Sequence, residues 1–256
     1  MTALLDIAGV SKRYGGVLAL DGVTFRVERG RIKGLIGPNG AGKTSLFNCV
    51  CGVLRVDAGH IRYAGRDLSG LRPHRRARMG IARTFQTLEL FRELTVLENL
   101  MVPVDARSPR GMVADALRLP AARFEEHRAD ERARALLHFL GIGDVAGVPG
   151  GDLPIGIQRR VELGRALALR PTLLLLDEPA AGLDSRETAD LAGVLSRIRE
   201  RFGTTMLLVD HDMSLVMRVC DDIAVLDYGR LIAEGPPERI REDPTVVRAY
   251  LGEGAA

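Results

Sequence analysis

The stretch Gly37-Pro38-Asn39-Gly40-Ala41-Gly42-Lys43-Thr44 fits the pattern G-x-x-x-x-G-K-[ST]. It lies between an apolar run, Ile32 to Ile36, which we expect to form a strand, and a segment from Lys43 to about Cys51, which we expect to form a helix. Glycines let successive backbone N–H groups point inward, and the helix adds its positive N-terminal end. The sequence therefore predicts a loop that binds the phosphates of a nucleoside triphosphate.

Within this loop the Lys43 ammonium is expected to reach the β and γ phosphates, and the Thr44 hydroxyl can bind Mg²⁺. Ser45 follows on the same first helical turn and joins the candidate nucleotide-binding residues. An ordinary glycine-rich turn with a neighbouring lysine is the alternative, and the match in this strand-to-helix context argues against it. The loop does not choose among P-loop families.

The second feature is an acidic pair. Asp177 and Glu178 come directly after the apolar run Leu173 to Leu176. Ligands bind at the carboxyl ends of strands in a parallel α/β sheet. We expect Asp177 to hold Mg²⁺ through water and Glu178 to polarise the attacking water as general base. The alternative is that the two carboxylates lie in an ordinary solvated turn after a strand. The presence of a phosphate loop in the same chain argues against this alternative.

Two further polar residues complete the candidate site. His211 follows the apolar run Thr205 to Val209 and is a candidate contact for the γ-phosphate, although a histidine after a strand is usually a surface residue. Gln86 precedes a change of composition and could reach the metal or the attacking water if that junction lies near the phosphates.

The chain alternates strand-like and helix-like segments, which favours an α/β core with a parallel sheet. Residues 87–170 are rich in Ala, Leu, Arg and Glu, and we expect a mostly helical insertion, broken at 108–111 and 148–151. Other expected elements are strands at Leu5 to Val10, Val23 to Val27 and His60 to Ala64, an amphipathic helix with Leu191, Val194, Leu195 and Ile198 on one face, and a closing hairpin from Ile223 to Ala233.

The composition argues against nucleic-acid binding. Of 256 residues 46% are hydrophobic and 27% charged, and the 36 basic and 33 acidic residues nearly balance. Aromatic residues make up only 4%, with no Trp, so stacking on nucleic acid has little to use. The basic run from Arg72 to Arg78 is more simply read as a solvated face than as a nucleic-acid site. We expect no nucleic-acid partner.

Cys49, Cys51 and Cys220 have no CxxC spacing, and we expect buried or idle thiols. No signal peptide is evident in Met1 to Asp6. Apolar runs fall short of the roughly 18 residues that a membrane-spanning helix needs. A membrane role would therefore be supplied by partner chains.

With these motifs in this order, the chain resembles the nucleotide-binding subunits of ABC transporters over essentially its whole length. The resemblance implies one ABC ATPase domain, 1–256, with a RecA-like core and antiparallel β subdomain at 1–86 and 171–256 and a helical subdomain at 87–170. It implies adenine stacking on Tyr14 and a Q-loop glutamine at Gln86. It also implies a switch histidine at His211 and Walker B residues at Asp177 and Glu178. The D-loop would be Ala181, Gly182, Leu183 and Asp184, and the signature facing a partner's ATP would be Leu153, Pro154, Ile155, Gly156, Ile157 and Gln158.

Finer phrases resemble the branch of this family that serves uptake of branched-chain amino acids. They are Arg83 to Gln86, Leu90 to Leu100, Glu178 to Asp184 and Arg248 to Glu253. That branch implies a second ATPase subunit, equal or different, two membrane permeases and an external binding protein, with this chain at the cytoplasmic face of the membrane. It also includes urea-type importers, so the solute stays open.

The signature departs from the family's usual Leu-Ser-Gly-Gly-Gln, because Pro154 has neither a hydroxyl nor an N–H to offer a γ-phosphate. Gly156 and the following helix could still donate backbone N–H groups. In a head-to-tail dimer this weakening falls on the nucleotide held by the partner. We therefore expect unequal hydrolysis at the two sites of a heterodimer.

Two other functional classes remain as alternatives. A soluble ABC ATPase acting on nucleic acid or the ribosome usually has two cassettes or a long coiled coil, and this chain has one cassette and no heptad run. A nucleotide-dependent switch that barely hydrolyses ATP is disfavoured by the presence of both Glu178 and His211.

Overall fold

The structure is a computed structural model of the chain, and it describes residues 3–84, 89–105 and 120–251. The chain divides into two compact units: unit 1 comprises residues 1–86 and 172–256, and unit 2 comprises residues 87–171. Both β-sheets belong to unit 1. Unit 2 is built from helices, as the composition of that segment predicts.

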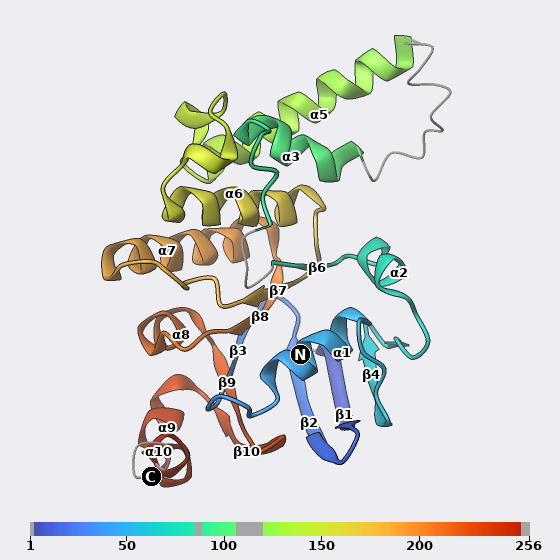
Figure 1. Ribbon diagram of the computed structural model, residues 1–256, viewed down its shortest axis with the longest axis vertical. Helices are drawn as coiled ribbons and strands as arrows, with labels where there is room; N and C mark the ends of the chain where they lie inside the picture. The colour runs from blue at the N-terminus through green and yellow to red at the C-terminus, as the bar shows by residue number, and fades with distance from the viewer. Residues whose placement is uncertain (1–2, 85–88, 106–119, 252–256) are drawn as a thin grey trace. The chain divides into compact units, whose positions relative to one another are not determined.

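The larger sheet of unit 1 has the strand order β10-β9-β3-β8-β7-β6 (Figure 1). Its strands are β3 (Ile32–Ile36), β6 (Ile81–Arg83), β7 (Leu173–Asp177), β8 (Thr205–Val209), β9 (Asp222–Asp227) and β10 (Arg230–Gly235). All neighbours are parallel except the β9–β10 hairpin. Every residue of β3, β7 and β8 is buried, which explains their continuous apolar sequence. The carboxyl ends of these three strands therefore lie together at one edge.

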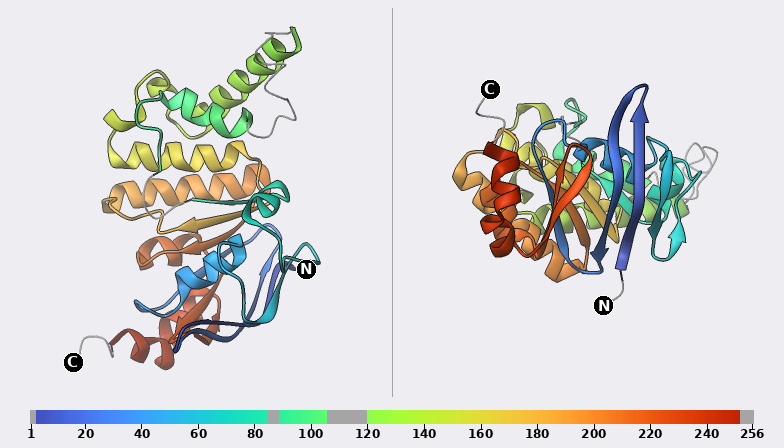
Figure 2. Two further views of the ribbon diagram at one scale, coloured as in Figure 1. Left: turned by 45° about the vertical axis from the view of Figure 1, so that its right-hand side comes forward. Right: turned by 90° about the horizontal axis from the view of Figure 1, so that it is seen from below.

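The smaller sheet is antiparallel, with the order β2-β1-β4-β5. Its strands are β1 (Ala3–Tyr14), β2 (Val17–Glu28), β4 (Ala58–Tyr63) and β5 (Arg66–Asp67), and Figure 2 shows β1 and β2 as a long pair. Val23, Phe25 and Val27 are buried while Thr24 and Arg26 are exposed. This confirms the alternation that predicts a half-buried strand.

The helices of unit 1 are α1 (Lys43–Cys51), α2 (Pro73–Arg78), α7 (Ser185–Phe202), α8 (Met213–Val219), α9 (Pro237–Glu242) and α10 (Pro244–Leu251). Helix α1 ends at Cys51, and the next residue, Gly52, caps it with a φ of 81°, the left-handed conformation common after helix ends. In α7 the predicted apolar face is buried, comprising Leu191, Val194, Leu195 and Ile198. The sequence did not predict α2, β5 or β6, which are too short to set up a pattern.

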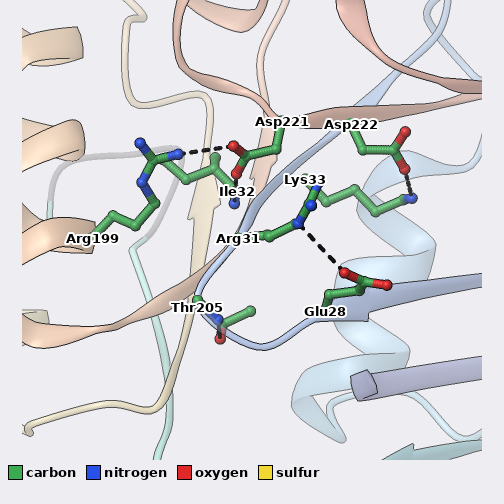
Figure 3. A network of polar contacts seen from close by, with 9 residues as sticks. Glu28, Arg31, Ile32, Lys33, Arg199, Thr205, Asp221 and Asp222 are labelled. Carbon is green, nitrogen blue, oxygen red and sulfur yellow. Dashed lines mark hydrogen bonds and ion pairs between the residues drawn. The ribbon is translucent and has the colours of Figure 1, made fainter. Parts of the chain in front are cut away.

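A polar network holds the amino ends of the larger sheet, away from the edge where β3, β7 and β8 end (Figure 3). Asp221 accepts a hydrogen bond from the Ile32 N–H at 2.8 Å and pairs with Arg199 on α7 at 2.9 Å. The Thr205 hydroxyl accepts from the Gly30 N–H at 2.9 Å. The buried Lys33 pairs with Asp222 and Glu234. These bonds fix the strands at one end, so that loops at the other end can carry chemistry.

Unit 2 contains α3 (Val96–Asp105), α5 (Pro120–Phe139) and α6 (Ile155–Ala168), with short 3-10 turns at Gly143–Val145 and Gly150–Asp152. Its buried Asn99 organises the segment before α3. The Asn99 side chain accepts from the Phe91 N–H at 3.0 Å and donates to the carbonyl oxygens of Phe91, Leu94 and Thr95 at 2.9–3.1 Å. The expected break at 108–111 lies outside the described residues.

Among the described residues, no helix has the length and apolar character that crossing a membrane requires.

Arg76 is an exception to the prediction that the basic run from Arg72 to Arg78 is a solvated face, because it is buried while its neighbours on α2 are exposed. It donates to the carbonyl oxygens of Cys49 and Val50 at 2.7 and 2.8 Å, and thereby satisfies the C-terminal end of α1.

Candidate functional site

The phosphate loop connects β3 to α1, as the sequence predicts, and its glycines are sterically required. Gly37 has a φ of 148°, and a Cβ there would lie 2.0 Å from the carbonyl oxygen of Leu226. At Gly42, with a φ of 100°, a Cβ would lie 2.5 Å from the carbonyl oxygen of Ala19. Because backbone occupies both places, only glycine lets the loop pass so close to its neighbours.

The candidate phosphate-binding cation lies over this loop. Lys43 is buried, and its Nζ donates to the carbonyl oxygens of Gly37 at 2.6 Å and Pro38 at 2.8 Å. The loop is anchored in turn where the Gly229 N–H donates to the Ala41 carbonyl at 3.0 Å. Asn39, Gly40 and Thr44 are exposed and Ser45 is half-buried. The loop thus combines one buried ammonium, exposed polar residues and a helix N-terminus.

The predicted acidic pair lies at the same edge of the sheet. Asp177 is the last residue of β7 and is 2% exposed, and β8 is the one strand between β7 and β3. Glu178 follows with a φ of 50°, a left-handed conformation that is uncommon outside glycine. Its N–H donates to the Val209 carbonyl at 2.7 Å, which holds the strained residue against the end of β8.

His211, predicted as a γ-phosphate contact, lies beside the predicted base. Its Nε2 is 3.2 Å from Oε2 of Glu178, within hydrogen-bonding distance. The Glu178 side chain is 14% exposed and the His211 side chain 58% exposed. The Glu178 side chain is therefore mostly buried, while the His211 side chain faces solvent, where a phosphate could approach it.

Asp210, which sequence reasoning passed over, ties together the two loops that carry these residues. It is 2% exposed, and its carboxylate accepts from the Ala180 N–H and the Asp212 N–H, each at 2.9 Å. Burial raises the pKa of Asp210, and those two N–H groups act in the opposite direction. The signal in the sequence was an acidic residue directly after an apolar strand. The functional prediction for this loop was made for the neighbouring His211 instead.

Arg83 was not predicted to be a site residue, and in the structure it contacts Asp177. This residue ends β6, and its Nη2 contacts Oδ2 of Asp177 at 2.6 Å. Its Nη1 donates to Oδ1 of Asn48 on α1 at 2.6 Å. The arginine therefore joins the candidate metal carboxylate to the helix that follows the phosphate loop. No sequence pattern indicated this pairing, because the three residues are far apart in the chain.

The remaining predicted residues of unit 1 are placed as follows. Tyr14 ends β1 and is 45% exposed, with the Lys12 ammonium 5.9 Å from its ring centroid. In the expected D-loop, Ala181 donates to the Glu178 carbonyl at 3.1 Å. Asp184 caps α7 by accepting from the Glu187 N–H at 2.7 Å. Gln86 lies outside the described residues.

The expected signature lies in unit 2, at the start of α6. Pro154 is the N-cap of the helix without a side-chain bond, and its carbonyl accepts from the Ile157 and Gln158 N–H groups at 3.0 Å. The Gln158 side chain turns back and donates to the Leu153 carbonyl at 2.8 Å. The N–H groups of Ile155 and Gly156 have no acceptor within the helix, so they can serve a ligand.

The three cysteines are free thiols, as predicted, with Cys49 and Cys220 buried and Cys51 half-buried. Burial raises the pKa of Cys49 to about 11 and also raises those of Cys51 and Cys220. At neutral pH these groups are protonated, which suits packing rather than chemistry.

Comparison with known proteins agrees with this geometry. Residues 20–181 match the family model described as ABC transporter, and residues 230–256 match the model described as branched-chain amino acid ATP-binding cassette transporter. The chain therefore belongs to the ATP-binding proteins of ABC transporters, the ATPases that couple ATP hydrolysis to transport.

Within that family the chain is similar to branched-chain amino acid transport proteins. It is 42% identical over 250 residues to the high-affinity branched-chain amino acid transport ATP-binding protein BraF of Pseudomonas aeruginosa, covering 98% of each chain. The protein LivG of Escherichia coli K12, which has the same description, gives the same figures.

A crystal structure of an ABC transporter cassette in its ADP conformation is 31% identical, with a TM-score of 0.86 over 98% of this chain. The predicted ABC fold, an α/β core with an antiparallel β subdomain, is confirmed.

Proposed function

We propose that this chain is the ATP-hydrolysing subunit of an importer for branched-chain amino acids or a closely related small solute. Its similarity to BraF and LivG over 98% of its length supports this substrate class. The C-terminal match, residues 230–256, supports it from a region outside the ATPase motifs. The single observation that carries the ATPase role is the contact of Glu178 with His211 at the sheet edge where the phosphate loop begins.

The phosphates of ATP are bound by the loop from Gly37 to Thr44. Lys43 already has its ammonium fixed over this loop, so little side-chain ordering remains when a nucleotide binds. The aromatic ring of Tyr14 is exposed and can stack on adenine.

The donor groups available for a metal suit Mg²⁺. The Thr44 hydroxyl is exposed, and Asp177 brings a carboxylate to the same sheet edge. Among the described residues, no cluster of three or more His, Cys, Asp or Glu is placed to hold a metal. Few protein ligands of hard oxygen type, with the rest from phosphates and water, match the preference of Mg²⁺. When bound there, Mg²⁺ neutralises charge on the β and γ phosphates.

Glu178 acts as the general base in this proposal. Its carboxylate is mostly sheltered, and its left-handed backbone is held by the bond to Val209, so it is pre-positioned to take a proton from water. His211 orients that carboxylate and, being exposed, contacts the γ-phosphate. Gln86 contributes to the same metal and water, as the family resemblance implies.

A second ATPase chain completes each site. The signature of this chain offers its partner the N–H groups of Ile155 and Gly156, and Pro154 contributes no donor. The D-loop, Ala181 to Asp184, lines the same dimer interface. If the partner has a serine in its signature, the nucleotide on this chain's phosphate loop has all its donors. The nucleotide on the partner's phosphate loop faces the signature with Pro154 and has fewer donors. We therefore propose unequal hydrolysis in a heterodimer.

Two permeases carry the membrane part, and the segment around Phe91, in unit 2, receives a helix of a permease. Phe91 is 45% exposed, and the Arg165 guanidinium lies 4.8 Å from its ring centroid. Asn99 fixes the backbone of this segment, and the Gly150 and Gly151 N–H groups donate to Leu94 and Arg92 at 2.9 and 3.0 Å. The permease-facing segment is thus bonded to the turn before the signature, and the two can move together.

This assembly places the chain at the cytoplasmic face of the membrane through its permeases. The test is to purify the tagged chain from its native membrane and identify its companions. Two permeases and an ATPase subunit support the proposal, whereas ribosomal proteins would reject it in favour of a soluble ABC ATPase.

A further inference from the structure

We infer that Arg83 is a positioning residue for the metal site, because its guanidinium holds the Asp177 carboxylate in a fixed orientation relative to the phosphate-loop helix. This inference rests on the proposed role of Asp177 in binding Mg²⁺. It assigns a task to a residue that the motifs of the site do not include.

The geometry gives Arg83 two separate partners on two elements. Its Nη2 lies 2.6 Å from Oδ2 of Asp177, at the end of β7, and its Nη1 lies 2.6 Å from Oδ1 of Asn48, on α1. The backbone adds a further link, because the Asp177 N–H donates to the Thr84 hydroxyl at 3.3 Å. Both the main chain and the carboxylate of Asp177 are therefore tied to the end of β6.

Helix α1 presents one face to the guanidinium. The ring centroid of Phe47 lies 5.9 Å from the Arg83 Cζ, and the Cys51 thiol, one turn further on, also interacts with Arg83. Phe47, Asn48 and Cys51 lie on neighbouring positions of the helix surface. The Arg83 side chain is 14% exposed and that of Asp177 is 2% exposed, so the pair is little screened by water.

The consequence for the metal follows from which oxygen is engaged. Arg83 holds Oδ2, and Oδ1 of Asp177 would then be the oxygen that accepts a hydrogen bond from a metal-bound water. A group that orients a metal-binding carboxylate from behind commonly determines how tightly the site holds the ion. Because α1 begins at the phosphate loop, the Asn48 contact also ties the Asp177 carboxylate, through Arg83, to the helix that follows that loop.

Only arginine can make this bridge. Its planar fork has several N–H donors in fixed directions, whereas lysine has one charged nitrogen that cannot reach two acceptors on different elements in the same way. Arg83→Lys therefore keeps the charge and loses one contact. Asn48→Ala loses the helix contact and keeps the ion pair.

The experiment measures Mn²⁺ binding to the full chain saturated with ADP, by electron paramagnetic resonance, and measures ADP binding separately in EDTA. We expect Arg83→Met to weaken Mn²⁺ binding by about ten-fold, and Arg83→Lys and Asn48→Ala by about three-fold each. ADP binding in EDTA should stay within about two-fold, because the contacts of Arg83 described above are with Asp177 and with helix α1 rather than with the loop from Gly37 to Gly42.

Arg76→Lys is the matched control. Arg76 is a second buried arginine that donates to α1, at its opposite end, and it has no part in the metal site. The Arg76→Lys variant should have a lower melting temperature and an unchanged Mn²⁺ affinity. If Arg83→Met does not fold, Arg83→Lys and Asn48→Ala carry the test.

Unchanged or tighter Mn²⁺ binding in the Arg83 and Asn48 variants would overturn the inference, and so would an equal loss in Arg76→Lys. Asp177→Asn separates the two levels of the argument. If Asp177→Asn also leaves Mn²⁺ binding unchanged, the proposed metal role of Asp177 is wrong. If it weakens binding while the Arg83 variants do not, only the role of Arg83 is wrong.

Discussion

The Nε2 atom of His211 lies 3.2 Å from Oε2 of Glu178, although the two residues come from loops after different strands. Two further bonds join those loops: Glu178 N–H to the Val209 carbonyl, and Ala180 N–H to Asp210. Glu178, the proposed base, and His211, the proposed γ-phosphate contact, are thus held together by the main chain as well as by their own contact. This arrangement exists within a single chain, before any partner is added.

Replacing Glu178 by Gln should abolish most of the turnover while nucleotide binding remains. Loss of a positioned general base lowers a rate by about 10²–10⁴-fold. The measurement is phosphate release by the assembled transporter, with ATP binding as the control. Pro154→Ser in the same assembly should change turnover less, because it adds a donor to a signature that already has backbone N–H groups. The reverse ranking of these two variants contradicts the account.

Replacing Asp210 by Ala should both destabilise the chain and slow hydrolysis, although Asp210 need not touch the nucleotide. Two backbone N–H groups, of Ala180 and Asp212, would lose their acceptor, at a cost of about 2 kcal/mol. Thermal unfolding and turnover measure the two effects.

Asp212→Ala is the control for that prediction. It removes the N-cap of α8, where Asp212 accepts from the Ser214 N–H at 2.8 Å, and should cost about 1 kcal/mol. Turnover should fall far less than in Asp210→Ala. Equal losses of turnover would mean that the tie between the two loops has no functional role.

Gly37→Ala should lower the melting temperature more than Gly40→Ala. Both residues have positive φ values, 148° and 78°, so both substitutions strain the backbone. A Cβ at Gly37 also meets the Leu226 carbonyl oxygen at 2.0 Å, whereas at Gly40 nothing lies within 4 Å. Differential scanning calorimetry of the two variants measures the difference. Equal melting temperatures would show that the close approach is not a constraint.

The native chain should react slowly with iodoacetamide at pH 8 and faster as the pH rises. With a pKa of about 11, only about one Cys49 thiol in a thousand is ionised at pH 8, and the thiolate is the reactive form. Mass spectrometry counts the adducts, and denaturation in urea should expose all three thiols. Rapid alkylation of native Cys49 at pH 8 would contradict its burial.

The sequence predicted the phosphate loop and the buried strands with almost the observed bounds, since both have strong local patterns. For example, β3 and β8 coincide with the predicted Ile32 to Ile36 and Thr205 to Val209. His211 could be placed near Glu178 because parallel strands end at a common edge.

The roles of Arg83, Asp210 and Asn99 could not be predicted in this way. Each acts through contacts with backbone or side chains that folding brings together. In the sequence, a buried charged or amide residue at a strand end or in a helix cannot be distinguished from an exposed one. Arg76 makes the same point, because it lies in a basic run that is otherwise exposed and is buried among carbonyl oxygens. A pattern of residue types does not distinguish these cases.

The most direct test of the central claim is ATP-driven uptake of radiolabelled leucine into proteoliposomes containing this chain, its companion ATPase and permeases, with the binding protein outside. We predict uptake that requires ATP on the side of this chain and is lost when only this chain carries Glu178→Gln. Uptake that is independent of ATP, or unchanged in the Glu178→Gln assembly, would contradict the account.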